Sequence, residues 1–146
     1  MITFRVPGLP IAQPRQRHRI AKTADGKAFS RNYVDGEHPI HAYKFAVKMA
    51  AQGVYRNPPL PPGCAVGIQL EFVFPRTKSK TKKRKPNLRE PHTSRYDVDN
   101  LCKGVFDALK GIVFNDDSQI YVVTATKWIA GDDDLPGVTV SVFWRE

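Results

Sequence analysis

The sequence predicts a single α+β domain over residues 1–146, with one mixed β-sheet and two helices packed against it in the order β-α-β-α-β-β. Three observations lead to this prediction. The 146 residues are 41% hydrophobic and 25% charged, as is usual for one soluble globular domain. Two stretches repeat apolar residues with the helical period of about 3.6. Four others alternate in hydrophobicity or are rich in β-branched and aromatic residues, which is typical of strands.

The N-terminal part contains the first strand and the first helix. A weakly alternating segment over residues 2–8 ends in Pro7-Gly8, which is a turn signal, and it predicts a strand. Residues 13–36 show little apolar periodicity, so we expect a loop there. The first helix is expected over residues 37–54, where apolar residues recur at helical spacing.

The middle of the chain alternates between strand, loop and helix. Residues 65–74 carry apolar side chains at every second position and predict a strand. The polar run over residues 75–96 is expected to be a basic, mobile loop or hairpin arm. A second helix is expected over residues 100–109, with Asp99 as its N-cap and Gly111 as its C-terminal stop.

The C-terminal part contains two stretches that predict strands, over residues 120–129 and 138–144. Because they are close in sequence, we expect them to pair as a terminal hairpin. The acidic run over residues 132–134 is then expected to be a solvated turn.

The charge of the chain favours a polyanionic partner. Lys and Arg number 23 against 14 Asp and Glu, which gives a net charge of +9. Residues 76–95 hold nine basic residues and one acidic residue, and the predicted loop over residues 13–36 forms a second basic patch. The basic residues expected to bind DNA are Arg15, Arg17, Arg19, Lys80, Lys82, Lys83, Arg84, Lys85 and Arg95.

Several functional classes are disfavoured by the sequence. No run approaches the ~18 apolar residues of a membrane span, and the N-terminus does not read as a signal peptide, so a cytoplasmic protein is expected. A glycine-rich phosphate cradle is missing from the sequence, so no nucleotide cofactor is expected. Cys64 and Cys102 are not part of a CxxC pair and are expected in the core.

Acidic residues with one lysine form the chemically distinctive stretch. In extended backbone Asp97 and Asp99 would project to the same face, and Lys103 follows Asp99 by one helical turn. A further pair, Asp116 and Asp117, precedes the next predicted strand. Carboxylate oxygens suit Mg²⁺, and a nearby ammonium group suits a phosphate. The alternative is a helix cap with acids that face the solvent.

Three short motifs between residues 97 and 120 read D-x-D-N-L-x-K, D-A-L and D-D-x-Q-I. Together with G-L-P-I and Q-P-R-Q-R over residues 8–17, they resemble the RusA family of Holliday-junction resolvases, the phage-associated crossover-junction endodeoxyribonucleases. The resemblance implies a homodimer that depends on Mg²⁺, or on Mn²⁺, and cuts four-way DNA junctions by paired incisions. It also implies that Asp97, Asp99 and Asp117 bind the metal and that Lys103 is the essential lysine. Asp116 matches less well, and the basic segment over residues 76–89 is longer than in compact members.

Other interpretations stay open at this point. A non-catalytic module that binds nucleic acid would use Asp97 and Asp99 only as a helix cap, and a phosphoryl transferase would use them to bind a nucleotide. Lys103 would either stabilise negative charge in the transition state or orient the attacking water. For Tyr96 and Phe114, which flank the acids, a core or rim position is favoured over stacking on bases. The dimer interface is expected on the first helix or on the last two strands.

Overall fold

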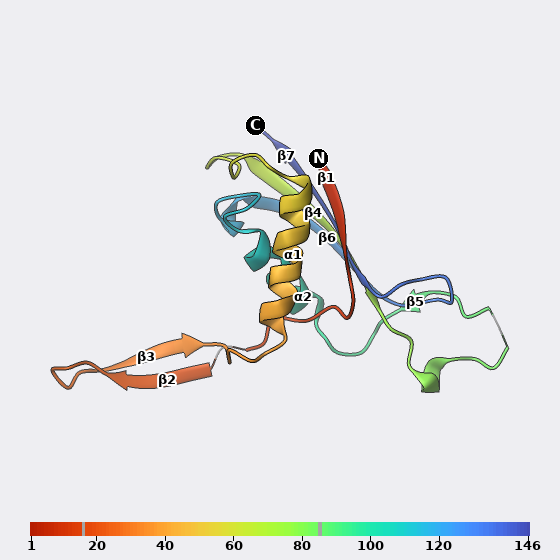
Figure 1. Ribbon diagram of the computed structural model, residues 1–146, viewed down its shortest axis with the longest axis horizontal. Helices are drawn as coiled ribbons and strands as arrows, with labels where there is room; N and C mark the ends of the chain where they lie inside the picture. The colour runs from red at the N-terminus through yellow and green to blue at the C-terminus, as the bar shows by residue number, and fades with distance from the viewer. Residues whose placement is uncertain (16, 85) are drawn as a thin grey trace.

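The structure, a computed structural model, describes residues 1–15, 17–84 and 86–146, and for residues 17, 18, 31 and 32 it describes the backbone. It confirms the α+β class. A five-stranded sheet has the order β1-β7-β4-β6-β5. Its elements, with the two helices, are β1 (Ile2–Pro7), α1 (Ile40–Val54), β4 (Ala65–Phe74), β5 (Glu90–Pro91), α2 (Val98–Leu109), β6 (Ile120–Ile129) and β7 (Gly137–Arg145) (Figure 1). The sheet is mixed as predicted, because β4 pairs parallel with β6 and antiparallel with β7.

The core lies between one face of the sheet and the two helices. The core-facing residues of β4, such as Ile68, Leu70 and Phe72, are buried, as are the apolar stripes of α1 and α2. The helices pack closely at Gly104 of α2, where an added Cβ would lie 3.3 Å from Ile40 Cδ1. The other face of β4 carries polar residues, of which Gln69 is exposed and Glu71 is half-buried. Cys64 and Cys102 are free and buried, which confirms them as core residues.

The helix boundaries refine the prediction. Helix α1 begins at Ile40 rather than at residue 37, with Pro39 at its N-cap, because a residue that precedes a proline is disfavoured in the helical conformation. Asp97, not Asp99, is the N-cap of α2, and Asp99 lies in its first turn. The predicted stop at Gly111 is confirmed: its φ of 77° is left-handed, and its N–H donates to Phe114 O at 2.7 Å.

The predicted terminal hairpin is wrong. Strand β4 lies between β6 and β7, so the two do not pair with each other. The segment that joins them crosses the end of β4, where Ala130 N donates to Phe74 O at 2.8 Å. The physical reason is burial: β4 is the most apolar strand and takes the centre, and α2 provides the crossover that a parallel β4–β6 pair requires.

The predicted loop over residues 13–36 instead contains a two-stranded hairpin of β2 (Arg17–Lys22) and β3 (Ala28–Tyr33). Its turn is closed by a hydrogen bond from Thr23 N to Lys27 O, with Gly26 at a φ of 84°. The hairpin projects from the body of the protein (Figure 1), so its strands lack the buried face that gives an alternating pattern. The pattern of apolar residues therefore did not predict these two strands.

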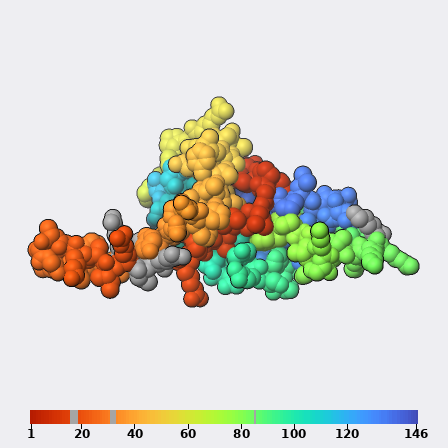
Figure 2. All heavy atoms as spheres, turned by 60° about the horizontal axis from the view of Figure 1, so that its bottom comes forward, coloured from red at the N-terminus to blue at the C-terminus, as the bar shows by residue number. Residues whose placement is uncertain are grey.

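A second projection lies at the opposite end of the molecule. It comprises residues 75–89, with a short 3₁₀ helix, η1 (Lys78–Lys80), and it leads into β5. Figure 2 shows this arm in green and the hairpin in red-orange, extending in opposite directions from the body. Among the described residues, no helix has the length and apolar character needed to cross a membrane.

Candidate nucleic-acid interface and active site

The arm is fixed to the sheet by Arg89. Its Nη2 lies 2.6 Å from Asp134 Oδ1 and its Nε lies 3.1 Å from Asp134 Oδ2, so the pair is bidentate. Its Nη1 lies 3.0 Å from Glu71 Oε2. The hydrogen bond with Asp134 raises the pKa of Arg89 and lowers the pKa of Asp134 from their ordinary values. Arg89 therefore serves as an anchor of the arm.

Further contacts hold the base of the arm in place. Arg76, whose side chain is 10% exposed, donates to Ala130 O at 2.9 Å and to Leu88 O at 2.5 Å. Asn87 is 2% exposed, and its N–H donates to Asp132 Oδ2 at 2.8 Å. The acidic run over residues 132–134 forms a turn with Asp132 and Asp133 exposed, as predicted, but Asp132 and Asp134 also hold the arm.

The close approach of the two segments requires Gly131. A Cβ at this position would lie 2.8 Å from Arg89 N and 3.0 Å from Asn87 O, which are both backbone atoms. The base of the arm is therefore held in place by these contacts, and its basic side chains extend from this fixed base.

Of the predicted DNA-binding residues on the arm, Lys82, Lys83 and Arg84 are exposed. Lys80 is also exposed, with its Nζ 4.0 Å from Glu90 Oε1. Lys85 lies outside the described residues.

On the other projection, Arg19 is exposed and Arg15 is exposed at the base of the hairpin, while the side chain of Arg17 lies outside the described part of the chain. Arg95 lies beside the start of α2, between the two projections. Figures 1 and 2 show the hairpin and the arm on either side of this region. The predicted DNA-binding residues on the hairpin and on the arm therefore lie on the two sides of the N-terminal end of α2.

The two aspartates of the D-x-D motif do not share a strand face, contrary to the expectation from extended backbone. Asp97 is the N-cap, whereas Asp99 is helical and exposed. Helical spacing places Asp99, Lys103 and Asp107 in one stripe along α2. Burial, with the Asp99 carboxylate adding to it, raises the pKa of the Cys102 thiol to about 11, so this thiol stays neutral.

Lys103 lies among acids. Its Nζ is 3.2 Å from Asp107 Oδ1 and 3.8 Å from Asp117 Oδ2. Lys44 of α1 approaches the other oxygen of Asp107 at 3.4 Å. The structure therefore brings together two of the predicted site residues, Lys103 and Asp117. Asp107 lies beside them but was not among the predicted site residues. Its position four residues after Lys103, one helical turn away, could have indicated this contact.

Asp116 has a structural role that Asp117 does not share. It caps η2 (Asp117–Gln119): its Oδ1 accepts from Ser118 N at 3.0 Å, and its N–H donates to Gln119 Oε1 at 3.0 Å. Its Oδ2 accepts from Lys110 Nζ at 2.5 Å. The Lys110 hydrogen bond is the main cause that lowers the pKa of Asp116 from its ordinary value.

The expected gathering of three aspartates is not found. Within residues 1–15, 17–84 and 86–146, no three His, Cys, Asp or Glu side chains are grouped so that they could hold a metal ion. Asp97 starts α2, and six residues of helix, about 9 Å along the axis, separate it from Lys103, which lies beside Asp117. Carboxylates suit Mg²⁺ by their chemistry, but this arrangement does not present them together.

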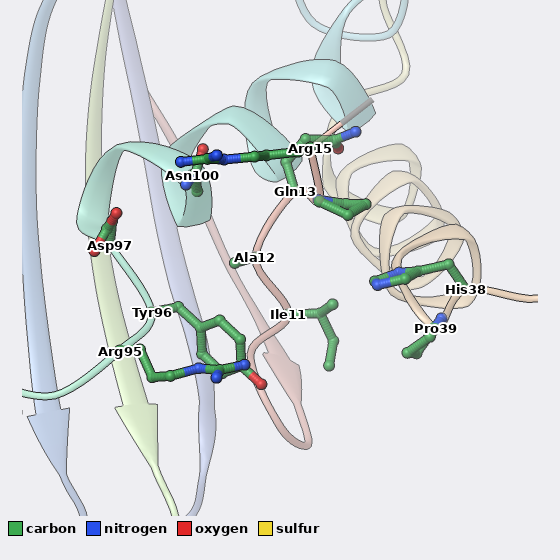
Figure 3. A pocket seen from close by; sticks show the side chains of 11 residues that line it. Ile11, Ala12, Gln13, Arg15, His38, Pro39, Arg95, Tyr96, Asp97 and Asn100 are labelled. Carbon is green, nitrogen blue, oxygen red and sulfur yellow. The ribbon is translucent and has the colours of Figure 1, made fainter. Parts of the chain in front are cut away.

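A cleft of about 630 Å³ opens in front of the start of α2 (Figure 3). The loop that carries Gln13 forms its floor and is tied to α2 by a hydrogen bond from Gln13 N to Asn100 O at 2.9 Å. Arg95, Tyr96 and Asp97 also line it. No sequence pattern pointed to this cleft, because its walls come from three separate segments.

Comparison with known proteins agrees with the motif pattern. The family model described as Endodeoxyribonuclease RusA matches residues 7–143. The chain is also 30% identical over 131 residues to the "Uncharacterized protein YqaN" of Bacillus subtilis (strain 168), and the match covers 87% of each chain. The family match spans both helices, both projections and the D-x-D and D-D motifs. The chain therefore belongs to the RusA family of Holliday-junction-resolving endodeoxyribonucleases.

Proposed function

We propose that this protein is a structure-selective, Mg²⁺-dependent endonuclease that resolves four-way DNA junctions by paired phosphodiester hydrolysis. Beyond family membership, one observation carries the proposal: Lys103 lies 3.8 Å from Asp117, on an exposed stripe of the helix that both basic projections flank. An ammonium group can stabilise charge on a phosphate, and a carboxylate can help to hold a metal ion, so the pair carries two of the groups that phosphodiester hydrolysis can use.

DNA capture is assigned to the two projections and to Arg95. The exposed cations of the arm, together with Arg15 and Arg19, offer several phosphate contacts on a chain with a net charge of +9. Binding should therefore weaken steeply as the salt concentration rises. The anchored base of the arm supports this role, since cations on a fixed platform lose less conformational entropy when they bind.

Mg²⁺ is proposed to be held by Asp97, Asp99 and Asp117, whose carboxylate oxygens fit this ion by their chemistry; Mn²⁺ suits the same ligands. When bound, the ion supplies Lewis-acid stabilisation of phosphate oxygens and a water of lowered pKa. The described side chains are not grouped for this, and the Lys103 ammonium lies near Asp117 instead. Ion binding therefore requires these side chains to rearrange.

Lys103 contributes through its own charge. Its ammonium group is balanced by Asp107 at 3.2 Å, which holds it at the exposed surface of α2. From there it either stabilises the negative charge that develops on the phosphate or orients the attacking water. Removing one preorganised donor of this kind costs on the order of a hundredfold in rate.

A symmetric homodimer is proposed, because a four-way junction offers two equivalent scissile phosphates. The edge of β6 is the surface that supports it. Within the described chain, β5 pairs with β6 only at Trp128 and Ile129, which leaves the rest of that edge without a neighbouring strand. Tyr121 is 53% exposed, and residues 120–126 carry no charge. Two such edges can pair with each other without charge repulsion.

The deciding experiment incubates the purified protein with a labelled four-way junction or a linear duplex, with Mg²⁺, with Mn²⁺ or with a chelator. We expect metal-dependent nicks at symmetric positions in the junction and no cutting of the duplex. Binding without cutting in any metal would instead support a non-catalytic module, the alternative that the ungrouped acids favour.

A further inference from the structure

We propose that the cleft of about 630 Å³ at the start of α2 binds a single unstacked nucleotide of the junction, next to the phosphate that is cut. This inference rests on the proposed function and assigns a substrate subsite within it. Asp97, one of the proposed metal ligands, stands at the rim of the cleft, so an occupant would lie beside this end of the proposed catalytic site (Figure 3).

The size of the cleft fits one nucleotide and excludes a duplex. Its volume falls within the range of about 300–1,000 Å³ for sites that enclose a small molecule. A paired base cannot enter such a site, so a nucleotide must leave the stack to occupy it. At the crossover of a four-way junction the stacking is already interrupted, which lowers the cost of this step.

One wall of the cleft provides flat groups for stacking. The Tyr96 ring is 40% exposed and lies nearly parallel to the Phe74 ring, with centroids 6.5 Å apart and an interplanar angle of 19°. The Arg95 guanidinium carbon lies 5.2 Å from the centroid of the Tyr96 ring. Aromatic rings and guanidinium planes both stack on bases. The fully buried Phe114, by contrast, is a core residue as predicted.

The floor and the opposite wall provide hydrogen-bonding groups. Gln13 Oε1 is buried and has no hydrogen-bond partner among the described residues, although the Gln13 backbone is fixed on Asn100. Buried acceptors are normally hydrogen-bonded, so a donor group on a bound ligand would satisfy this one. On the other side, His38 Nδ1 accepts from Ile40 N at 3.1 Å, so the neutral ring carries its proton on Nε2, which donates. A base edge offers both donors and acceptors.

The charges on the rim match a nucleotide within a strand. Arg15 and Arg95 come from different segments and both line the cleft, so they can contact the phosphates on the two sides of an enclosed nucleotide. A free nucleotide has the same chemistry, but it would not engage the hairpin and the arm. We therefore assign the cleft to a nucleotide of the bound strand.

The test uses four-way junctions with 2-aminopurine at single positions around the crossover, bound to the protein in chelator so that no cutting occurs. The fluorescence of this base rises when it leaves the stack. We expect a several-fold rise at one position, repeated in the symmetry-related strand, and none in a linear duplex. The same experiment records binding through the electrophoretic shift of the junction.

Variants of the cleft separate this subsite from general DNA binding. Gln13→Leu and Tyr96→Ala should abolish the rise while junction affinity falls by less than about tenfold, since the cations of both projections remain. Tyr96→Phe keeps the ring and should keep the rise, and the retained junction affinity of Tyr96→Ala excludes misfolding as the cause of its loss. Phe45→Ala, which removes an exposed aromatic ring from α1 outside the cleft, is the matched control and should behave as wild type.

Three results would overturn the inference. The first is a fully bound junction without a fluorescence rise at any position, and the second is an unchanged rise in both Gln13→Leu and Tyr96→Ala. The third is saturable binding of free deoxynucleoside monophosphate that the two substitutions abolish while the rise persists, which would make the cleft a site for the free nucleotide. Failure to bind the junction at all would instead contradict the proposed function itself, and this inference with it.

Discussion

Breaking the pair between Arg89 and Asp134 should release the arm and weaken the fold by a measurable amount. The pair has two charge-assisted hydrogen bonds, at 2.6 Å and 3.1 Å, and both side chains are partly buried. Each such bond is worth about 1.5–3 kcal/mol, and partial exposure reduces this through solvent screening. We expect a coupling free energy of about 2 kcal/mol. Asp134→Ala alone should cost about 3 kcal/mol, because Gly131 N also loses its acceptor at 2.8 Å.

The measurement is a double-mutant cycle of Arg89→Ala and Asp134→Ala by urea unfolding. Because the cycle gives only the interaction free energy between these two side chains, the free energy of the separate Arg89–Glu71 contact cancels. For a protein of this size, a loss of about 2 kcal/mol shifts the urea midpoint by roughly 1 M. Asp133→Ala, which removes an exposed neighbouring acid, is the control and should change the midpoint little.

The pH dependence of the coupling has a definite sign. Because the pKa of Asp134 is lowered in the folded state, its contribution is present above the ordinary value of 3.8 and is lost as the pH falls through the folded pKa. A coupling below about 0.5 kcal/mol at pH 7, or one that grows in acid, would refute the role assigned to the pair.

The remaining predictions concern DNA binding, acid stability and assembly. Replacing Lys82, Lys83 and Arg84 together with Ala should reduce the slope of log affinity against log salt by about 2–3 units, and an unchanged slope would remove the arm from the DNA interface. Burial lowers the pKa of His92 from its ordinary 6.5, so the unfolding free energy should decline as the pH falls below 6.5; His92→Gln should flatten this decline in urea titrations, and an identical decline would contradict the assignment. Val123→Lys, in the middle of the exposed β6 edge, should convert a dimer to a monomer in light scattering, and a dimer that persists would place the interface elsewhere.

The elements that periodicity predicted are those with a buried face. Helices α1 and α2 and strand β4 each bury one stripe or face of apolar residues, and the spacing of those residues is visible in the sequence. The hairpin of β2 and β3 buries no such face, so its pattern carried no signal. The periodicity of apolar residues also does not predict which strands are neighbours in the sheet. Residues of β6 and β7 both have strand character, but β4 is the more buried strand and lies between them.

The candidate site was predictable in part for a similar reason. Lys103 and Asp117 belong to short, specific sequence motifs, and the structure places them 3.8 Å apart, while their catalytic role stays a prediction. The pinning of the arm was not predictable, since Arg89 and Asp134 are 45 residues apart and their pairing depends on the crossing of two loops. The N-cap position of Asp97 was missed because Asp97 and Asp99 are equally suitable caps by residue type.

The central claim is that Asp117 takes part in metal-dependent cutting rather than in capture of the DNA. The most direct measurement compares wild type, Asp117→Asn and the exposed-acid control Asp133→Asn on the same labelled four-way junction, with Mg²⁺ and with a chelator. We predict that Asp117→Asn binds the junction as tightly as wild type or more tightly but cuts at least about a hundredfold more slowly, while Asp133→Asn cuts normally. Cutting by Asp117→Asn at the wild-type rate, or wild-type cutting that continues in chelator, would contradict the account.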